Sequence, residues 1–87
     1  MIRREVALPD KEVLQRRTAA QLVQVASRFD ARIMIEHQSK IINAKSMLGL
    51  LSLGAVTDGR LYLVADGEDE QRAVDAIVKL LDSNFAE

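Results

Sequence analysis

The sequence predicts an α+β fold, in which helices cover one face of a four-stranded β-sheet. Four segments alternate between apolar and polar residues, as strands with one buried and one solvated face do. Two longer segments carry apolar residues at helical spacing, and a short apolar run supplies a third helix. The elements follow one another as strand, helix, strand, strand, helix, strand, helix. The helices must therefore cover the apolar face of one sheet.

The first strand and helix lie before residue 31. Residues 2–8 alternate weakly and end at Pro9-Asp10, a dipeptide typical of turns. From about residue 16 to Asp30, an apolar stripe at helical spacing predicts a helix. The expected inward positions are Ile2, Val6 and Leu8 in the strand and Ala19, Leu22, Val23, Ala26 and Phe29 in the helix.

Two short strands follow in the middle of the chain. Ile33 and Ile35 alternate with polar or flexible neighbours and predict a second strand. Gln38-Ser39 makes a tight connection to a third strand over Lys40–Asn43.

The last strand and helix are set off by turn residues. Thr57-Asp58-Gly59 predicts a turn before the fourth strand, and Asp66-Gly67 predicts a turn after it. The acids at 68–70 suit the positive end of a helix dipole. The inward positions are Leu61, Leu63 and Ala65 in the strand and Ala73, Val74, Ile77, Leu80 and Leu81 in the helix.

Composition limits the kinds of function. The 87 residues make one compact domain, 1–87, and 12 basic residues nearly balance 13 acidic ones. This balance argues against direct nucleic-acid binding. The absence of cysteine excludes disulfides, thiolate zinc sites and a cysteine nucleophile. We expect neither a metal nor another cofactor. No signal peptide or membrane-length apolar segment is visible, so the expected location is the cytoplasm, away from membranes.

The stretch NAKSMLGLLSLG, residues 43–54, contains the most informative serine. Ser46 precedes an apolar run that is too crowded to share one face of a short helix. As a helix N-cap, Ser46 has a simple structural explanation, because serine oxygens satisfy free N–H groups there. A phosphate at Ser46 would also be tolerated beside those N–H groups. We expect Leu50 and Leu53 to point inward, and Met47, Leu48 and Leu51 to remain exposed as a docking surface.

This stretch resembles the regulatory serine region of HPr, the small phosphocarrier of the bacterial sugar phosphotransferase system. The resemblance continues through AAQLVQVASRFDA (19–31) and ADGEDEQRAVDAIVKLL (65–81) and covers nearly the whole chain in register. It implies the HPr open-faced β-sandwich, with four antiparallel strands and three helices on one side, in the order βαββαβα. It also implies two partners. The HPr serine kinase/phosphorylase would modify Ser46, and a catabolite control transcription regulator would bind the phosphoprotein as corepressor.

One position departs from HPr in a way that changes the chemistry. The phosphocarrier motif, roughly Gly-Leu-His-Ala-Arg-Pro-Ala, aligns with residues 13–19, and Gln15 occupies the place of the phosphate-accepting histidine. Imidazole has an available lone pair, whereas the lone pair of an amide nitrogen is delocalised into the carbonyl. The chain is therefore expected not to be an enzyme or a phosphocarrier. His37 lies far from this motif in the HPr fold and is expected to be an ordinary strand or turn residue.

The pattern of a retained serine and a glutamine at the histidine position is similar to the catabolite-repression homologues within the HPr family. Val13, Arg16 and Thr18 are further departures from the phosphocarrier motif. Arg17 matches a family arginine that holds phosphate groups, and its planar fork suits phosphoserine or a carboxylate. The resemblance implies a partner-binding surface made by Gln15, Arg17, Ala20, Gln24, Ser46, Met47, Leu48 and Leu51.

Three functions remain open. The first is a non-enzymatic regulatory module switched at Ser46, and the second is a phosphocarrier, which Gln15 disfavours. The third is a degenerate HPr module that binds partner proteins and leaves Ser46 unused. The expected assembly is a monomer or a weak homodimer, because the N-terminal strand lies at a sheet edge in the HPr fold and can exchange between copies.

Overall fold

The computed structural model describes residues 1–7, 16–53 and 60–83 of the chain. Its elements follow the predicted order. The predicted positions Leu8, Pro9-Asp10 and Thr57-Asp58-Gly59 lie outside the described residues. The elements are β1 (Ile2–Ala7), α1 (Arg16–Ala26), β2 (Arg32–His37), β3 (Lys40–Asn43), α2 (Met47–Ser52), β4 (Arg60–Asp66) and α3 (Glu70–Asp82).

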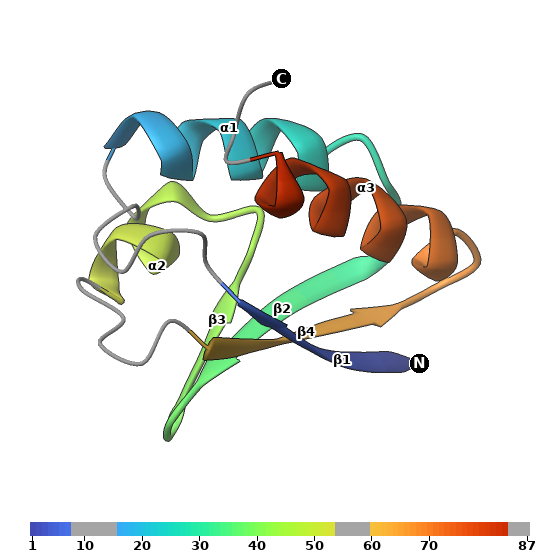
Figure 1. Cartoon of the computed structure of the whole chain (residues 1–87), viewed down its shortest axis with the longest axis horizontal. Helices are drawn as coiled ribbons and strands as arrows, with labels where there is room; N and C mark the ends of the chain where they lie inside the picture. Colours follow the sequence, from blue (N-terminus) through green and yellow to red (C-terminus); the bar gives the residue numbers. More distant parts are fainter. Residues whose placement is uncertain (8–15, 54–59, 84–87) are drawn as a thin grey trace.

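The four strands form one antiparallel sheet in the order β1-β4-β2-β3. The three helices lie on one side of this sheet and leave the other side open (Figure 1). The open-faced sandwich implied by the resemblance is therefore confirmed. Both β1 and β3 are edge strands, so the predicted edge position of the N-terminal strand is also confirmed.

The core lies between the helices and the two central strands. Ile33 and Ile35 of β2 are paired with Ala65 and Leu63 of β4, and all four side chains are buried. This is the alternation that the sequence predicted, since side chains two residues apart share a face of a strand. The predicted stripe of α3 is buried as a whole: Ala73, Val74, Ile77, Leu80 and Leu81.

Helix α1 differs from its prediction in its end and in its buried face. It ends at Ala26 rather than near Asp30, because the N–H groups of Arg28 and Phe29 bond to carbonyls three residues back, in a tighter turn. Val25 is buried, whereas Val23 is only half-buried. Since α1 packs against both α2 and α3, its buried arc is wider than the single stripe and includes Val25.

On the open side of the sheet, Arg3 connects three neighbouring strands. Its guanidinium carbon lies 3.7 Å from the centre of the Tyr62 ring on β4. Its Nε donates to a Glu36 carboxylate oxygen on β2 at 3.2 Å. Stacking on an aromatic ring and a charge-assisted hydrogen bond both favour this position of the guanidinium. The side chain of Arg3 thus holds β1 against its own sheet.

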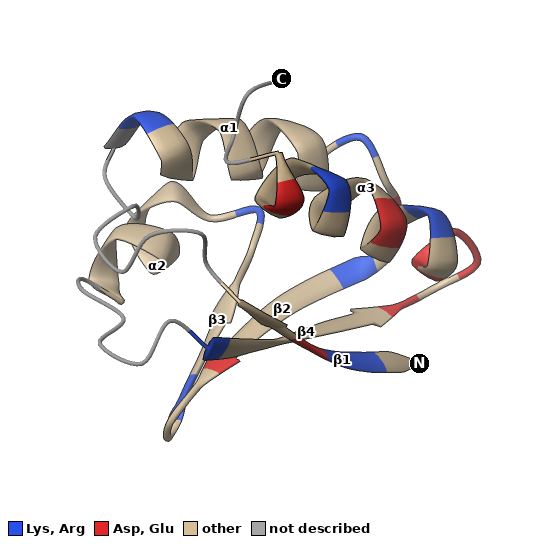
Figure 2. Cartoon of the chain, viewed as in Figure 1, with Lys and Arg blue, Asp and Glu red and all other residues tan. Residues whose placement is uncertain are grey.

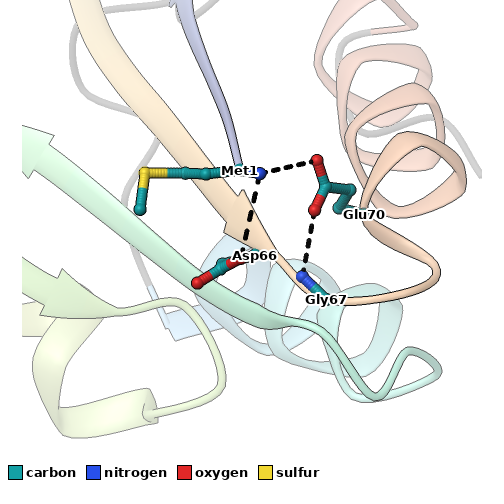
Figure 3. A network of polar contacts seen from close by, with 4 residues as sticks. All are labelled: Met1, Asp66, Gly67 and Glu70. Atoms are coloured by element: carbon teal, nitrogen blue, oxygen red, sulfur yellow. Dashed lines mark hydrogen bonds and ion pairs between the residues drawn. The ribbon is translucent and has the colours of Figure 1, made fainter.

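A second polar contact holds the beginning of β1 (Figure 3). The α-amino group of Met1 lies 3.0 Å from a Glu70 carboxylate oxygen and 3.8 Å from an Asp66 oxygen. The other Glu70 oxygen accepts the Gly67 N–H at 3.1 Å. The hydrogen bond to Glu70 raises the pKa of the amino group, and the Gly67 N–H is the main reason that the pKa of Glu70 is lowered. These bonds connect β1 to the junction between β4 and α3.

Candidate functional site

Ser46 lies between β3 and α2 and caps the helix, as predicted. Its backbone is extended, with φ −108° and ψ 115°, and its Oγ accepts the Gly49 N–H at 3.1 Å. Its carbonyl accepts the first helical hydrogen bond, from Leu50 at 3.0 Å. A serine hydroxyl has two lone pairs and one proton. The cap uses one lone pair, so the proton and the second lone pair remain available for chemistry.

The turn before Ser46 is held by bonds that the sequence did not predict. The Asn43 side-chain oxygen accepts the Lys45 N–H at 2.8 Å, and the Asn43 carbonyl accepts the Ser46 N–H at 3.0 Å. The Lys45 ammonium donates to the Phe29 carbonyl at 2.6 Å, just beyond the end of α1. Ser46 is therefore held by both neighbouring segments. Asn43 at the end of a strand is a typical turn residue, which is the one signal that pointed to it.

Helix α2 has one exposed and one buried face. Leu50 is 0% and Leu53 7% exposed, while Leu48 is 82% exposed, and all three match the prediction. Met47 and Leu51 were expected to be exposed, but they are half-buried and pack against the core. The expectation was wrong because residues at i, i+3 and i+4 share a helix face, so Met47 and Leu51 lie beside buried Leu50.

The other predicted contact residues are distributed along α1. Arg17 and Gln24 are exposed and Ala20 is half-buried. The beginning of α1, where basic residues lie, is at the same end of the molecule as α2 (Figure 2). Binding of a phosphate by Arg17 stays a prediction, and Gln15 lies outside the described residues.

His37 is the last residue of β2 and is 8% exposed, on the face that carries Ile33 and Ile35. Its predicted role as an ordinary strand residue agrees with this position. Within residues 1–7, 16–53 and 60–83, no group of three His, Cys, Asp or Glu side chains is arranged to hold a metal ion. In the same ranges, no helix is both long and apolar enough to cross a membrane.

Asp69 has a role that the sequence did not reveal. An acid before α3 was expected to favour the helix dipole, but its side chain makes no cap bond. Its two oxygens instead accept the N–H groups of Asp30 and Ala31, each at 2.9 Å. These bonds, with that of Asp30 as the largest cause, lower the pKa of Asp69. Asp69 thereby joins the loop after α1 to the beginning of α3.

The fold and the capped serine define a class of protein that comparison with known families identifies. A family model described as "PTS HPr component phosphorylation site" matches residues 2–83. The chain belongs to the HPr family.

Within this family, the chain is similar to both Crh and HPr proteins. It is 39% identical over 82 residues to the HPr-like protein Crh of Halalkalibacterium halodurans. This alignment covers 94% of this chain and 98% of the relative. HPr-C-His of Thermoanaerobacter tengcongensis is 39% identical, with a TM-score of 0.92 over 100% of this chain and 98% of that one. The domain-swapped Crh dimer of Bacillus subtilis is 37% identical, with a TM-score of 0.76 over 100% of both chains.

Proposed function

We propose that this chain is a Crh-type regulatory protein of carbon catabolite repression, consisting of a single HPr-like domain. The HPr serine kinase phosphorylates Ser46, and the phosphoprotein acts as corepressor for a catabolite control transcription regulator. The observation that carries the proposal is the position of Ser46, half-buried at the start of α2 and two residues before the 82% exposed Leu48. The proposal places the chain in the cytoplasm, where these partners act.

Phosphorylation needs a nucleophilic oxygen and a phosphoryl donor. The Ser46 Oγ forms a bond to the γ-phosphorus of a nucleoside triphosphate, and the bond from this phosphorus to the bridging oxygen breaks. The nucleoside diphosphate leaves, and a base of the kinase takes the hydroxyl proton. This chain supplies only the acceptor oxygen and is itself no enzyme.

The added phosphate changes charge rather than shape. The phosphate adds a charge of about −2 and three strong acceptor oxygens. These oxygens lie next to backbone N–H groups at the start of the helix, which favour a negative charge. Basic groups on the regulator, or Arg17 of this chain, then form charge-assisted hydrogen bonds to the phosphate. One to three such bonds at about 1.5 kcal/mol each, the lower end of the usual range, correspond to a gain in affinity of roughly tenfold to thousandfold.

The proposed docking surface combines this phosphate with apolar and polar neighbours. Leu48 is its most exposed apolar residue, and the half-buried Met47 and Leu51 flank it. Exposed apolar residues beside a charged group are typical of protein contact sites. The surface continues onto α1 with Arg17, Ala20 and Gln24, and the proposal adds Gln15, which precedes the helix in the sequence.

The runner-up function is a phosphocarrier, which the HPr relatives favour. Gln15 opposes it on chemical grounds, since an amide nitrogen cannot accept a phosphoryl group as imidazole does. A degenerate module that leaves Ser46 unused is the third function. The net charge of −1 leaves no excess of basic residues for DNA, so any effect on transcription passes through a protein partner.

We also propose a weak homodimer in which β1 exchanges between two copies. Its support is the edge position of β1, which pairs with β4 alone among the described strands, together with the swapped Crh dimer of Bacillus subtilis. An edge strand exchanges at low cost because each contact in one chain has an identical counterpart in the other.

A titration of the regulator tests the regulatory function. Wild-type protein is treated with the kinase, and its affinity is compared with that of the unphosphorylated form. Ser46→Ala removes the acceptor, and Ser52→Ala, at the other end of α2, is the matched control. We expect at least tenfold tighter binding for phosphorylated wild type and Ser52→Ala, and no kinase-dependent change for Ser46→Ala. Equal affinities of the two wild-type forms would leave Ser46 as a helix cap only.

A further inference from the structure

Gly49 is the third residue of α2, and the backbone does not explain why it is glycine. Glycine is the least favourable residue in a helix interior apart from proline. Positive φ, which favours glycine, occurs at Gly67 and not at Gly49. The backbone at Gly49 is therefore one that any residue can adopt.

The space around Gly49 is tight in the unmodified protein, but it does not exclude a methyl group. A Cβ at this position would lie 3.3 Å from the Ser46 Oγ, 3.4 Å from the Ser46 Cβ and 3.5 Å from the Asn43 carbonyl oxygen. These contacts are tight but do not overlap, and the nearest atom belongs to a small side chain. Alanine is thus accommodated if Ser46 shifts by a few tenths of an ångström.

The same contacts become restrictive once Ser46 carries a larger group. We propose that Gly49 is a positioning residue, which leaves open the space that a phosphate on Ser46 occupies. This inference rests on the proposed phosphorylation of Ser46. The phosphoryl oxygens extend beyond Oγ, on which a Cβ at residue 49 would already press at 3.3 Å. A methyl group there excludes the phosphate from that side.

The N–H of Gly49 gives this space a chemical use. In the unmodified protein it donates to the Ser46 Oγ at 3.1 Å. In the phosphoprotein, the phosphoryl oxygens are much stronger acceptors on the same side chain, and they take over this donor. Gly49 therefore provides both an N–H donor and the space for the phosphate that accepts from it. Gly49→Ala keeps the N–H but fills this space with a methyl group.

A kinase assay with three proteins separates this role from helix stability. Wild type, Gly49→Ala and Ser52→Ala are phosphorylated by the HPr serine kinase with a nucleoside triphosphate, and each melting temperature is measured. Both variants improve helix propensity, but only Gly49→Ala places a methyl beside Ser46. We expect kcat/KM at least about tenfold lower for Gly49→Ala, with no loss of melting temperature, and wild-type kinetics for Ser52→Ala.

A phosphorus NMR titration reports on the phosphate itself. The second pKa of the phosphoserine, ordinarily about 6, should be lowered in wild type by the Gly49 N–H and return towards 6 in phosphorylated Gly49→Ala. Equal phosphorylation rates together with equal pKa values for the two proteins would overturn the role of Gly49 and leave the regulatory function intact. A wild type that the kinase does not phosphorylate would overturn both.

Discussion

In the proposed function, two side chains decide which chemistry we expect of this chain. The resemblance to the phosphocarrier motif aligns Gln15 with the phosphate-accepting histidine of HPr proteins, and Ser46 offers a hydroxyl at the start of α2. An amide nitrogen does not accept a phosphoryl group, whereas a serine oxygen does so when a kinase supplies the base. On these two residues rests our proposal that the chain is a regulatory protein and not a phosphocarrier.

We predict that wild-type protein takes no phosphate from phosphoenolpyruvate through Enzyme I, the protein from which the histidine of HPr accepts phosphate. Gln15→His supplies an acceptor nitrogen, but Val13 and Thr18 also depart from the carrier motif. The variant should therefore regain only part of the activity of an HPr protein. Phosphate transfer to each protein is measured with labelled phosphoenolpyruvate. An acid-labile phosphohistidine at His37 of the wild type would contradict the prediction.

Replacing Ser46 tests its structural role separately. Ser46→Ala removes the acceptor for the Gly49 N–H and should lower the free energy of unfolding by about 1 kcal/mol, the typical effect of losing an N-cap. Urea unfolding measures this change. Ser46→Asp keeps an acceptor oxygen and should stay within about 0.5 kcal/mol of wild type. A loss as large for Ser46→Asp as for Ser46→Ala would show that the hydroxyl does more than cap the helix.

At the scale of elements, α2 divides its leucines between the core and the surface. Leu50→Ala opens a cavity under the helix and should cost about 2–5 kcal/mol of unfolding free energy. Leu48→Asp changes an exposed side chain, so its effect on stability should be within about 0.5 kcal/mol. Leu48→Asp should nevertheless weaken binding of the phosphorylated protein to the regulator. Titration calorimetry and urea unfolding check both effects, and wild-type affinity in Leu48→Asp would remove Leu48 from the docking surface.

Asp69 makes the stability of the helix layer depend on pH. Its pKa is lowered mainly by the Asp30 N–H, so it stabilises the fold above its unfolded pKa of about 4. This contribution disappears as the pH falls through the lowered pKa of the folded protein. Asp69→Asn has only one acceptor oxygen for the two N–H groups of Asp30 and Ala31. Its melting temperature at pH 7 should therefore be lower than that of wild type.

The comparison of the two proteins across pH tests this explanation. The difference in melting temperature between wild type and Asp69→Asn should be largest at pH 5–7. It should shrink below pH 4, because Asp69 of the wild type then becomes protonated. Gln71→Asn, at the exposed second residue of α3, is a control for general acid effects. A difference that is constant from pH 7 to pH 2 would mean that the Asp69 charge contributes nothing.

At the scale of the whole molecule, β1 is the element that exchanges between chains in the proposed dimer. It lies at an edge and is held there by Arg3 across β4 and β2 and by the Met1 amino group at Glu70. In a swapped dimer the same contacts form between two chains. Weakening them therefore destabilises the closed chain and the swapped dimer equally.

This symmetry gives a kinetic prediction for the proposed dimer. Arg3→Ala removes a stacked guanidinium worth about 0.5–1 kcal/mol at an exposed site, so exchange should be about two- to fivefold faster. The equilibrium fraction of dimer should stay unchanged. Size-exclusion chromatography after dilution measures both quantities, with Arg32→Ala as a control outside the contacts of β1. A changed dimer fraction at an unchanged rate would argue against strand exchange.

The sequence by itself determined the elements, the inward faces of the central strands and of the last helix, and the helix cap at Ser46. Alternation along Leu61, Leu63 and Ala65 and the stripe of α3 are short-range patterns, and they are reliable because a strand or helix repeats within a few residues. The expected loss of a phosphate acceptor rests on the match of Gln15 to the histidine of the phosphocarrier motif, and it stays a prediction.

Other features came only from the tertiary structure, because they depend on residues far apart in the chain. The burial of Val25 follows from how α1 packs against α2 and α3. The bonds of Asp69 to Asp30 and Ala31 join segments 38 or more residues apart. Local patterns carry no information on such contacts, so the space beside Ser46 at Gly49 became apparent only when the atoms around it were placed.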